Sequence, residues 1–329
     1  MSSKTRREFV HLAFAALPAA GLLSIPSRLV AADAKPDSKV AGVQIGMNVP
    51  YSFGSGVTDG DDILKNCVQL GLSGVELRAQ PVELFMGAPK ELIYPPKKDK
   101  NAPKTDAPKT AAPKTDGVSN AVKLKEWRKS APMDRAKEFR AKWEDAGVLI
   151  EIVKVDGIFK MSDDELDYAF TLAKTLGGRA ISSEISHTEA DLKRIGQFAD
   201  KHQLMVGYHG HATTKPEHWE AAFALAKFNG ANVDLGHFVA GNNTSPVPFL
   251  KKHHERITHV HVKDRKLNNG DNTPLGEGDT PIAEVLRLIR DSKWNMQATI
   301  EFEYKVPDGS DRMKELARTI KFCRDALAS

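Results

Sequence analysis

The sequence lacks several features that mark particular classes of protein. Only 2 of its 329 residues are cysteines, and both, Cys67 and Cys323, fall at apolar positions of predicted helices. We interpret them as two buried thiols, with a disulfide as the alternative in an oxidising compartment. The net charge of +4, from 47 basic and 43 acidic residues, leaves no large basic excess, so we expect no nucleic-acid partner. No Gly-x-Gly-x-x-Gly pattern follows the first predicted strand, which argues against a doubly wound open sheet.

The N-terminal residues 1–34 have no apolar run long enough for a typical membrane-spanning helix, which needs about 20 apolar residues. Paired arginines at positions 6 and 7 precede a short, interrupted apolar stretch, residues 9–25, and an alanine-rich stretch follows. This order is typical of a secretory signal, and the arginine pair resembles a twin-arginine signal. We predict export to a bacterial periplasm without a stable membrane anchor after cleavage. An uncleaved tether is the alternative.

Residues 95–117 form a second segment outside any regular pattern. Ala-Pro-Lys-Thr occurs three times at a five-residue spacing, and the segment holds no large apolar residue that could join a core. Proline removes hydrogen-bond donors and the lysines repel one another, so we predict a flexible insertion. It interrupts the connection after the second predicted strand, and in a barrel such connections lie on the face that carries the site.

Elsewhere, short apolar strands alternate with amphipathic helices. The predicted strands cover residues 43–48, 74–78, 148–155, 179–185, 204–208, 233–235, 257–262 and 297–304. The predicted helices cover residues 61–70, 121–130, 133–146, 163–176, 189–202, 216–228, 282–291 and 311–327. Eight strands, each followed by a helix or a long loop, predict an α/β fold: a single-domain (β/α)8 TIM barrel over residues 40–329.

The last two predicted strands place ionisable groups on one face. In the segment 257–263, His259, His261 and Lys263 alternate with apolar or small residues, and in the eighth strand Glu301 and Glu303 share the face turned to the barrel axis. Two inward carboxylates cannot stay charged and unpaired, because desolvation and mutual repulsion are both severe. A divalent cation would relieve them, and an ion pair with Lys263 or Lys305 is the alternative.

Other predicted strands also end in carboxylates or imidazoles. These residues are Glu184, His209, His211, Asp234 and His237. Each is a weak signal by itself, but together they predict a metal site. Mixed nitrogen and oxygen ligands suit Mn²⁺, Zn²⁺, Co²⁺ or Fe²⁺, with Mg²⁺ also considered, and the sequence does not choose among these ions.

Three motifs on the last three strands resemble the sugar phosphate isomerase/epimerase family of xylose isomerase-like TIM barrels. They are Asp-x-Gly-His from Asp234, His-Val-His-x-Lys-Asp from His259, and Ile-Glu-x-Glu-Tyr from Ile300. The resemblance implies that Asp234, His261 and Glu301 bind a divalent metal. The family's fourth ligand is usually a glutamate at the end of the fifth strand, where this sequence has His209. Either His209 or the neighbouring Glu184 takes that role, or both do.

The resemblance implies a metal-dependent isomerase or epimerase that moves a proton next to the carbonyl of a sugar, keto-sugar or cyclitol. In this scheme Glu184 or Glu303 is the base, His237 or His211 the acid, and Lys263 a donor to a substrate oxygen. A lyase or dehydratase acting on a keto-glycoside or an inosose-like substrate is the alternative, favoured by His209 in place of glutamate. A phosphodiester hydrolase and a non-catalytic sugar-binding barrel are further classes. We expect a small carbohydrate as partner and leave a homo-oligomer open.

Overall fold

The computed structural model describes residues 35–95 and 119–329. The predicted signal, residues 1–34, and all but the first residue of the predicted insertion therefore lie outside the described residues. Among the described helices, none is long and apolar enough to span a membrane.

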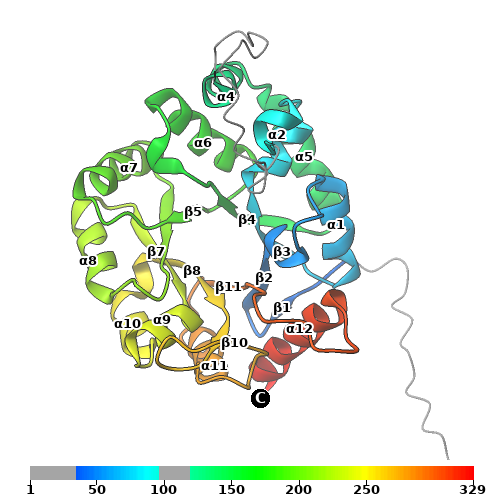
Figure 1. Cartoon of the computed structure of the whole chain (residues 1–329), viewed down its shortest axis with the longest axis vertical. Coiled ribbons are helices and arrows are strands. Elements are labelled where there is room, and N and C mark those ends of the chain that lie inside the picture. The colour runs from blue at the N-terminus through cyan, green and yellow to red at the C-terminus, as the bar shows by residue number, and fades with distance from the viewer. Residues whose placement is uncertain (1–34, 96–118) are drawn as a thin grey trace, which may run out of the picture. The chain divides into compact units, whose positions relative to one another are not determined.

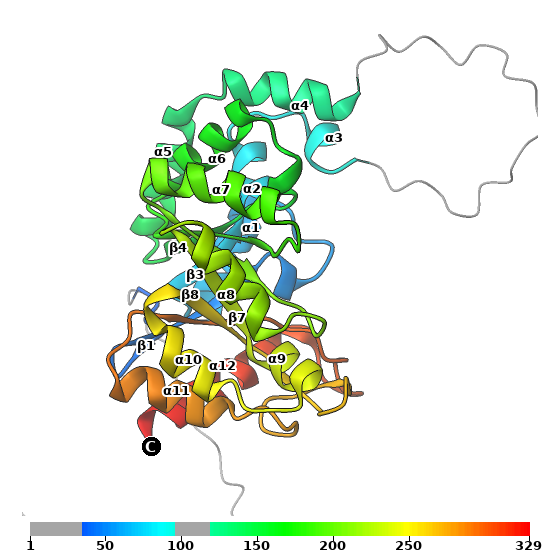
Figure 2. The ribbon, with the colours of Figure 1, turned by 90° about the vertical axis from the view of Figure 1, so that its left-hand side faces the viewer.

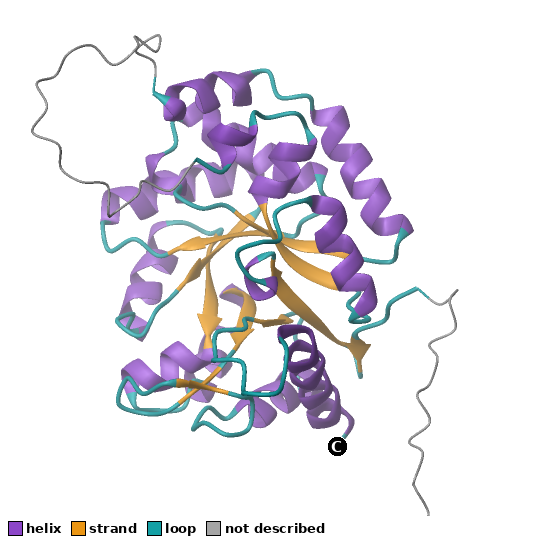
Figure 3. Ribbon diagram, turned by 45° about the vertical axis from the view of Figure 1, so that its right-hand side comes forward, coloured by secondary structure: helices purple, strands orange, loops and turns teal. Residues whose placement is uncertain are grey.

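Eight parallel strands form a closed ring at the centre of the molecule (Figures 1 and 3). They are β2 (Val43–Val49), β3 (Gly74–Arg78), β4 (Leu149–Lys154), β5 (Ala180–Glu184), β6 (Met205–His209), β7 (Asn229–Asp234), β8 (Ile257–Val262) and β11 (Gln297–Ile300). Each strand pairs with the next, and β11 closes the ring by pairing with β2. The predicted (β/α)8 TIM barrel is confirmed.

Helices surround the ring, as the side view in Figure 2 also shows. They are α1 (Gly60–Gln69), α2 (Ala79–Phe85), α3 (Lys90–Ile93), α4 (Asn120–Lys129), α5 (Met133–Asp145), α6 (Asp163–Thr175), α7 (Glu189–His202), α8 (Pro216–Leu225), α9 (Leu235–Asn242), α10 (Val247–His253), α11 (Ile282–Asp291) and α12 (Arg312–Ala328). Short additions are β1 (Lys39–Val40), β9 (Asp264–Arg265), β10 (Asn272–Thr273) and the 3-10 turns Tyr51–Phe53, Ile158–Lys160 and His254–Arg256.

The hydrophobic core lies between the strands and the helices. Helix α11 shows why: Ile282, Val285, Leu286 and Ile289 follow the spacing of one helical face, and all four are buried. Cys67 and Cys323 lie in the same core as free thiols, so the interpretation as buried thiols is confirmed and the disulfide alternative is wrong.

Two predicted boundaries near the site were wrong. Strand β7 begins at Asn229, four residues before the predicted start, because the buried Asn229 amide is hydrogen-bonded to the carbonyls of Leu192 and Ala222 and to Tyr208. The eighth strand stops at Ile300, so residues 301–304 lie beyond the sheet. Four helices, α2, α3, α9 and α10, were not predicted at all.

Candidate active site

Four buried side chains from four neighbouring strands meet at the carboxyl end of the barrel. His209 ends β6, Asp234 ends β7, His261 lies near the end of β8, and Glu301 follows β11. Their exposed fractions are 3%, 0%, 0% and 7%, and one potential ligand atom from each lies within 4.8 Å of the others. Four of the five residues that we predicted as metal ligands from separate parts of the sequence thus lie together, and the fifth, Glu184, lies behind His209.

Individual distances show how closely these four groups approach one another. His261 Nδ1 lies 3.3 Å from Glu301 Oε2 and 3.8 Å from Asp234 Oδ2. His209 Nε2 lies 3.5 Å from Asp234 Oδ2 and 3.9 Å from Glu301 Oε2. Two imidazole nitrogens therefore face the same two carboxylate oxygens.

The carboxylates are held in place by the elements that carry them. Asp234 is the N-cap of α9, and its Oδ1 accepts a hydrogen bond of 2.7 Å from the backbone N–H of His237. Its Oδ2 is left to face the cluster. Glu301 Oε1 accepts a hydrogen bond of 2.8 Å from Asn48 on β2, which leaves Oε2 to face His261.

Each imidazole of the cluster has a second carboxylate on its far side. His261 Nε2 lies 2.6 Å from Glu76 Oε2, and His209 Nδ1 lies 3.1 Å from Glu184 Oε2. Glu184 also binds Lys154 at 2.5 Å and His211 at 2.7 Å. Carboxylates behind histidine ligands are a common arrangement in metal sites, because they fix the ring orientation and tautomer.

Lys263 lies among three of the carboxylates. Its Nζ is 3.0 Å from Asp234, 2.6 Å from Glu301 and 2.8 Å from Glu303. The ion pair that we considered as the alternative to a metal is therefore present. One ammonium group does not neutralise three carboxylates, so the cluster keeps an excess of negative charge.

The electrostatics of the cluster follow from burial and from these neighbours. Burial would raise the pKa values of Asp234 and Glu301, but nearby cations, led by Lys263 for Asp234 and by His261 for Glu301, hold both well below their ordinary range. Burial would lower the pKa of His261, yet Glu301 and Glu76 raise it to about 10. The surrounding carboxylates thus stabilise a positive charge at this position.

This cluster fits a divalent cation. Two imidazoles and two carboxylates form a mixed nitrogen and oxygen donor set, the set expected for Mn²⁺, Zn²⁺, Co²⁺ or Fe²⁺. His261 Nδ1 is buried, faces the carboxylates and has no hydrogen-bond partner. A divalent cation would replace the proton that these carboxylates stabilise on Nδ1. Glu184 is set back from these four groups by the His209 ring.

The other predicted catalytic residues surround the cluster. His237, in the first turn of α9, lies 3.1 Å from Lys263 Nζ, and burial lowers its pKa to about 4, with Lys263 acting in the same direction. His211 lies at the surface, and its hydrogen bond with Glu184 raises its pKa. Glu303 is partly exposed, and although burial would raise its pKa, Lys263 holds the value below the ordinary one.

A hollow of about 620 Å³ opens beside Glu303. Tyr51, which is 42% exposed, lines it and donates a hydrogen bond of 2.5 Å to Glu303. Arg78 also lines the hollow and lies over the Tyr51 ring at 5.3 Å. The hollow gives a small molecule a route to Glu303. We did not predict Tyr51 or Arg78 as site residues, because Tyr51 lies in the turn after β2 and Arg78 is the last residue of β3, and neither belongs to a recognisable motif.

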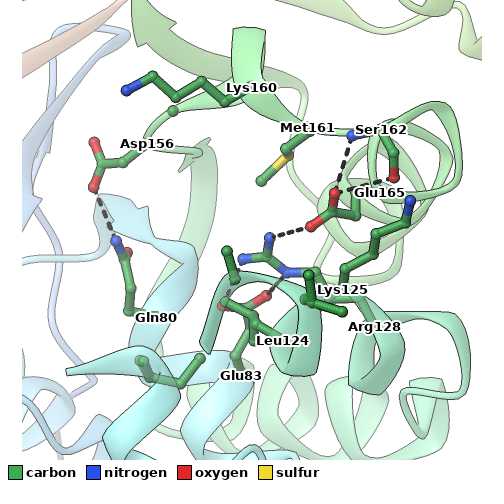
Figure 4. Close-up of a pocket in the computed structure, with 14 residues that line it drawn as sticks. Gln80, Glu83, Leu124, Lys125, Arg128, Asp156, Lys160, Met161, Ser162 and Glu165 are labelled. Carbon is green, nitrogen blue, oxygen red and sulfur yellow. Dashed lines mark hydrogen bonds and ion pairs between the residues drawn. The ribbon is translucent and has the colours of Figure 1, made fainter. Parts of the chain in front are cut away.

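A second hollow, of about 530 Å³, lies between α4 and the segment after β4 (Figure 4). Arg128 crosses its floor, bound to Glu83 at 2.8 Å and to Glu165 at 3.0 Å. Asp156 on its wall accepts a hydrogen bond from Gln80 and pairs with Arg78, which lines the first hollow. Because the buried charges here satisfy one another, we interpret this network as structural.

Glu76 and Lys154 were also missed. Glu76 is the one charged residue in the buried part of Gly-Val-Glu-Leu-Arg, flanked by Val75 and Leu77. Its position between two helix-facing apolar residues signals an inward side chain, and this could have identified it. The partners of Glu76 and Lys154 were not apparent, because they come from other strands.

With the fold and site described, the class of protein is clear: a TIM barrel with a polar cluster at the carboxyl end of its strands. Residues 164–326 match the family described as xylose isomerase-like TIM barrel, so this half of the chain carries that family's sequence pattern as well as its fold. The matched stretch includes Asp234, His261 and Glu301.

Similar proteins include both dehydratases and an epimerase. An inosose dehydratase of Clostridium botulinum (strain Eklund 17B / Type B) is 28% identical in an alignment over 135 residues that covers 34% of this chain and 45% of that protein. The match therefore spans less than half the length of this relative.

The solved structures that share the fold include a dehydratase and an epimerase. The probable 3-DHS dehydratase AsbF of Bacillus anthracis has a TM-score of 0.57 at 14% identity, covering 85% of this chain and 98% of that chain. The 3-keto-D-glucoside 4-epimerase YcjR of E. coli has a TM-score of 0.56 at 10% identity, covering 86% and 99%. At these identities the likeness concerns the fold alone.

Proposed function

We propose that this protein is a metal-dependent dehydratase that removes a proton next to the carbonyl of a keto-sugar or cyclitol and eliminates water. The observation that carries the proposal is the pair His209 and Glu184. An imidazole occupies the position where the family's epimerases place a second acid/base glutamate, and Glu184 is bound by Lys154, His209 and His211. That leaves the Glu303 carboxylate and the His211 imidazole as the groups for proton transfer.

His209, Asp234, His261 and Glu301 would hold the cation. A divalent cation supplies Lewis acidity, which polarises a substrate carbonyl and makes the neighbouring C–H more acidic. The chain supplies the proton transfers and the orientation of the substrate. The partial match to an inosose dehydratase supports this class of reaction.

Glu303 is the base in this proposal. Its side chain lines the first hollow, and Lys263 at 2.8 Å keeps its pKa low, so it is ionised at neutral pH and can accept a proton. Tyr51 and Lys263 fix the two carboxylate oxygens. The proton leaves the carbon next to the substrate carbonyl and passes to Glu303.

His211 is the acid. Its hydrogen bond with Glu184 favours the protonated ring, whereas burial keeps His237 unprotonated near neutral pH. As the bond between the β-carbon and its hydroxyl breaks, the hydroxyl takes the proton from His211 and leaves as water. The electron pair of the broken C–H bond forms the new carbon–carbon double bond, so atoms and charges balance.

Epimerisation or isomerisation is the second candidate. Two proton-transfer groups, Glu303 after β11 and His211 after β6, stand beside the cluster, and return of a proton to the opposite face of the carbon would invert it instead of eliminating water. The shared fold of a 3-keto-glucoside epimerase is compatible with this outcome.

The test uses purified protein loaded with Mn²⁺ and incubated in D₂O with 2-keto-myo-inositol and 3-keto-glucose. We expect loss of a C–H signal by proton NMR together with a conjugated enone product seen by ultraviolet absorption. Glu303→Gln should lower the rate by about 10²–10⁴-fold, whereas Glu83→Gln, a buried carboxylate outside the site, should not.

Exchange without enone, accompanied by a stereoisomer, would favour the epimerase. Neither exchange nor product across a panel of keto-sugars and inososes would contradict both candidates and favour a binding protein.

We also propose that the protein is exported, on the basis of its arginine pair and apolar N-terminal stretch. Replacing Arg6 and Arg7 by lysine should retain the protein in the cytoplasmic fraction. Unchanged periplasmic recovery of this variant would contradict the twin-arginine route.

A further inference from the structure

We propose that Glu76 is a positioning residue that sets the tautomer and orientation of His261 for binding the divalent cation. This inference rests on the proposed metal site, and it assigns a role to a strand, β3, that contributes no ligand to it. The residues are 185 positions apart in the sequence.

Glu76 and His261 approach each other closely inside the barrel. Glu76 Oε2 lies 2.6 Å from His261 Nε2, and both residues are 0% exposed. On the opposite side of the ring, Nδ1 faces Glu301 Oε2 at 3.3 Å and has no hydrogen-bond partner. The imidazole thus joins a buried carboxylate at one nitrogen to the proposed cation position at the other.

Proton accounting explains what Glu76 does. An ionised carboxylate only accepts hydrogen bonds, so at 2.6 Å the His261 Nε2 must carry a proton. In the neutral ring this leaves Nδ1 with a lone pair directed at Asp234 and Glu301, as a metal ligand requires. The carboxylate also makes the ring a stronger donor to a cation, because it stabilises positive charge on the imidazole.

The neighbouring His259 does not compete for this role. The Thr258 hydroxyl donates to the carbonyl of Ala231, so it accepts from His259 Nδ1 at 2.8 Å. His259 Nε2 then has no proton, and it has no hydrogen-bond partner although Glu76 Oε2 is 3.4 Å away. Glu76 therefore receives its short hydrogen bond from His261.

Asn232 is a second neighbour of His261 Nε2, and it would favour the opposite tautomer if it donated a hydrogen bond, because its Nδ2 lies 2.9 Å from His261 Nε2. If this amide donated to Nε2, the ring proton would sit on Nδ1 and block the metal. Amide nitrogen and oxygen can exchange places, and the Asn232 oxygen has no partner, so a turned amide would accept from Nε2–H instead. The position of the ring proton distinguishes the two arrangements.

The experiment compares Zn²⁺ binding by wild type, Glu76→Gln, Glu76→Leu and Glu83→Gln, by calorimetry with chelator competition. We expect Glu76→Gln, which keeps an acceptor but loses the charge, to bind about 10-fold more weakly, and Glu76→Leu about 100-fold. Glu83→Gln removes a carboxylate of similar burial from the Arg128 network and should leave Zn²⁺ affinity unchanged.

Two-dimensional NMR of ¹⁵N-histidine protein in the Zn²⁺ form adds a readout that a merely structural role would not move. Wild type should show the His261 proton on Nε2, and Glu76→Leu should lose this single tautomer. Unchanged Zn²⁺ affinity in a folded Glu76→Gln protein, or a proton on Nδ1 in wild type, would overturn the inference while leaving the proposed function standing. A wild type that binds no Zn²⁺, Mn²⁺ or Co²⁺ would overturn both.

Discussion

Replacing Lys263 by methionine tests whether the cluster is built for a cation. Lys263 is buried and contacts Asp234, Glu301 and Glu303 at 3.0, 2.6 and 2.8 Å. Methionine has a similar length but no charge, so the three carboxylates would lose their ammonium partner. Removing one member of a buried ion pair typically destabilises a protein by about 3–5 kcal/mol, and we expect a loss of that size in the presence of EDTA.

A divalent cation should then compensate. Any ligand that binds only the folded state stabilises it, by about 2.7 kcal/mol at a concentration 100 times its Kd. Because the cation no longer competes with the ammonium group for the same carboxylates, Lys263→Met should bind Mn²⁺ more tightly than wild type does. Mn²⁺ should therefore raise the free energy of unfolding more in the variant than in wild type.

The assay is urea unfolding followed by circular dichroism, with EDTA or with saturating Mn²⁺. Arg128→Met is the matched control, because Arg128 also lies between carboxylates but pairs with Glu83 and Glu165, away from the cluster. It should be destabilised as well, with the same response to Mn²⁺ as wild type. If Mn²⁺ stabilises Lys263→Met no more than it stabilises wild type and Arg128→Met, the ammonium group and a cation do not share a site.

Two further predictions concern stability away from the cluster. The pKa of Glu165 is lowered because hydrogen bonds from Ser162 and Arg128 outweigh its burial, so its stabilising contribution is complete above the ordinary glutamate pKa and is lost as the pH falls through the lowered one. Glu165→Gln should therefore flatten the acid limb of the urea midpoint plotted against pH, and an unchanged limb would contradict this. In α9, a Cβ at Gly241 would lie 1.8 Å from the carbonyl oxygen of Ala212, so Gly241→Ala should destabilise the protein by about 1–3 kcal/mol in urea unfolding. A urea midpoint equal to that of wild type would contradict this, because it would show that the segment after β6 moves away from the new methyl group without a measurable loss of stability.

The sequence alone was sufficient to predict the barrel and to predict which ionisable side chains of a single strand share a face. His259, His261 and Lys263 could be placed on one face because a period of two leaves no choice once one face is apolar. Glu301 could be placed in the same way, although the strand itself ends at Ile300, because its backbone N–H still donates to the carbonyl of Val262 on β8.

Contacts across the barrel could not be predicted. The pairing of Glu76 with His261 depends on which strands face each other across the interior, and this follows from closure of the ring rather than from either sequence segment. Strand β7 was predicted too short for a related reason. Asparagine is typical of turns, and Asn229 is accommodated in a strand because its amide donates to the carbonyls of Leu192 and Ala222, which come from other elements. The position of Tyr51 depends on the path of the connection after β2, and Arg78, at the end of β3, meets it only once the barrel has closed.

The neighbouring residues Glu184 and His209 connect the sequence most directly to the proposed chemistry. Glu184 at the end of β5 and His209 at the end of β6 lie side by side in register. The family's usual glutamate is expected at the end of β6, where this chain has His209, and Glu184 supplies a carboxylate from the neighbouring strand, behind the imidazole. With His209 as ligand, the four proposed groups carry two negative charges, which match a divalent cation, whereas a glutamate would add a third. The negative charge is kept at Glu184, where Lys154 and His211 balance it. The replacement of glutamate by His209 therefore preserves the number of proposed donors and places the carboxylate behind the imidazole, and in the proposed function this displacement is the reason for elimination rather than a two-carboxylate epimerisation.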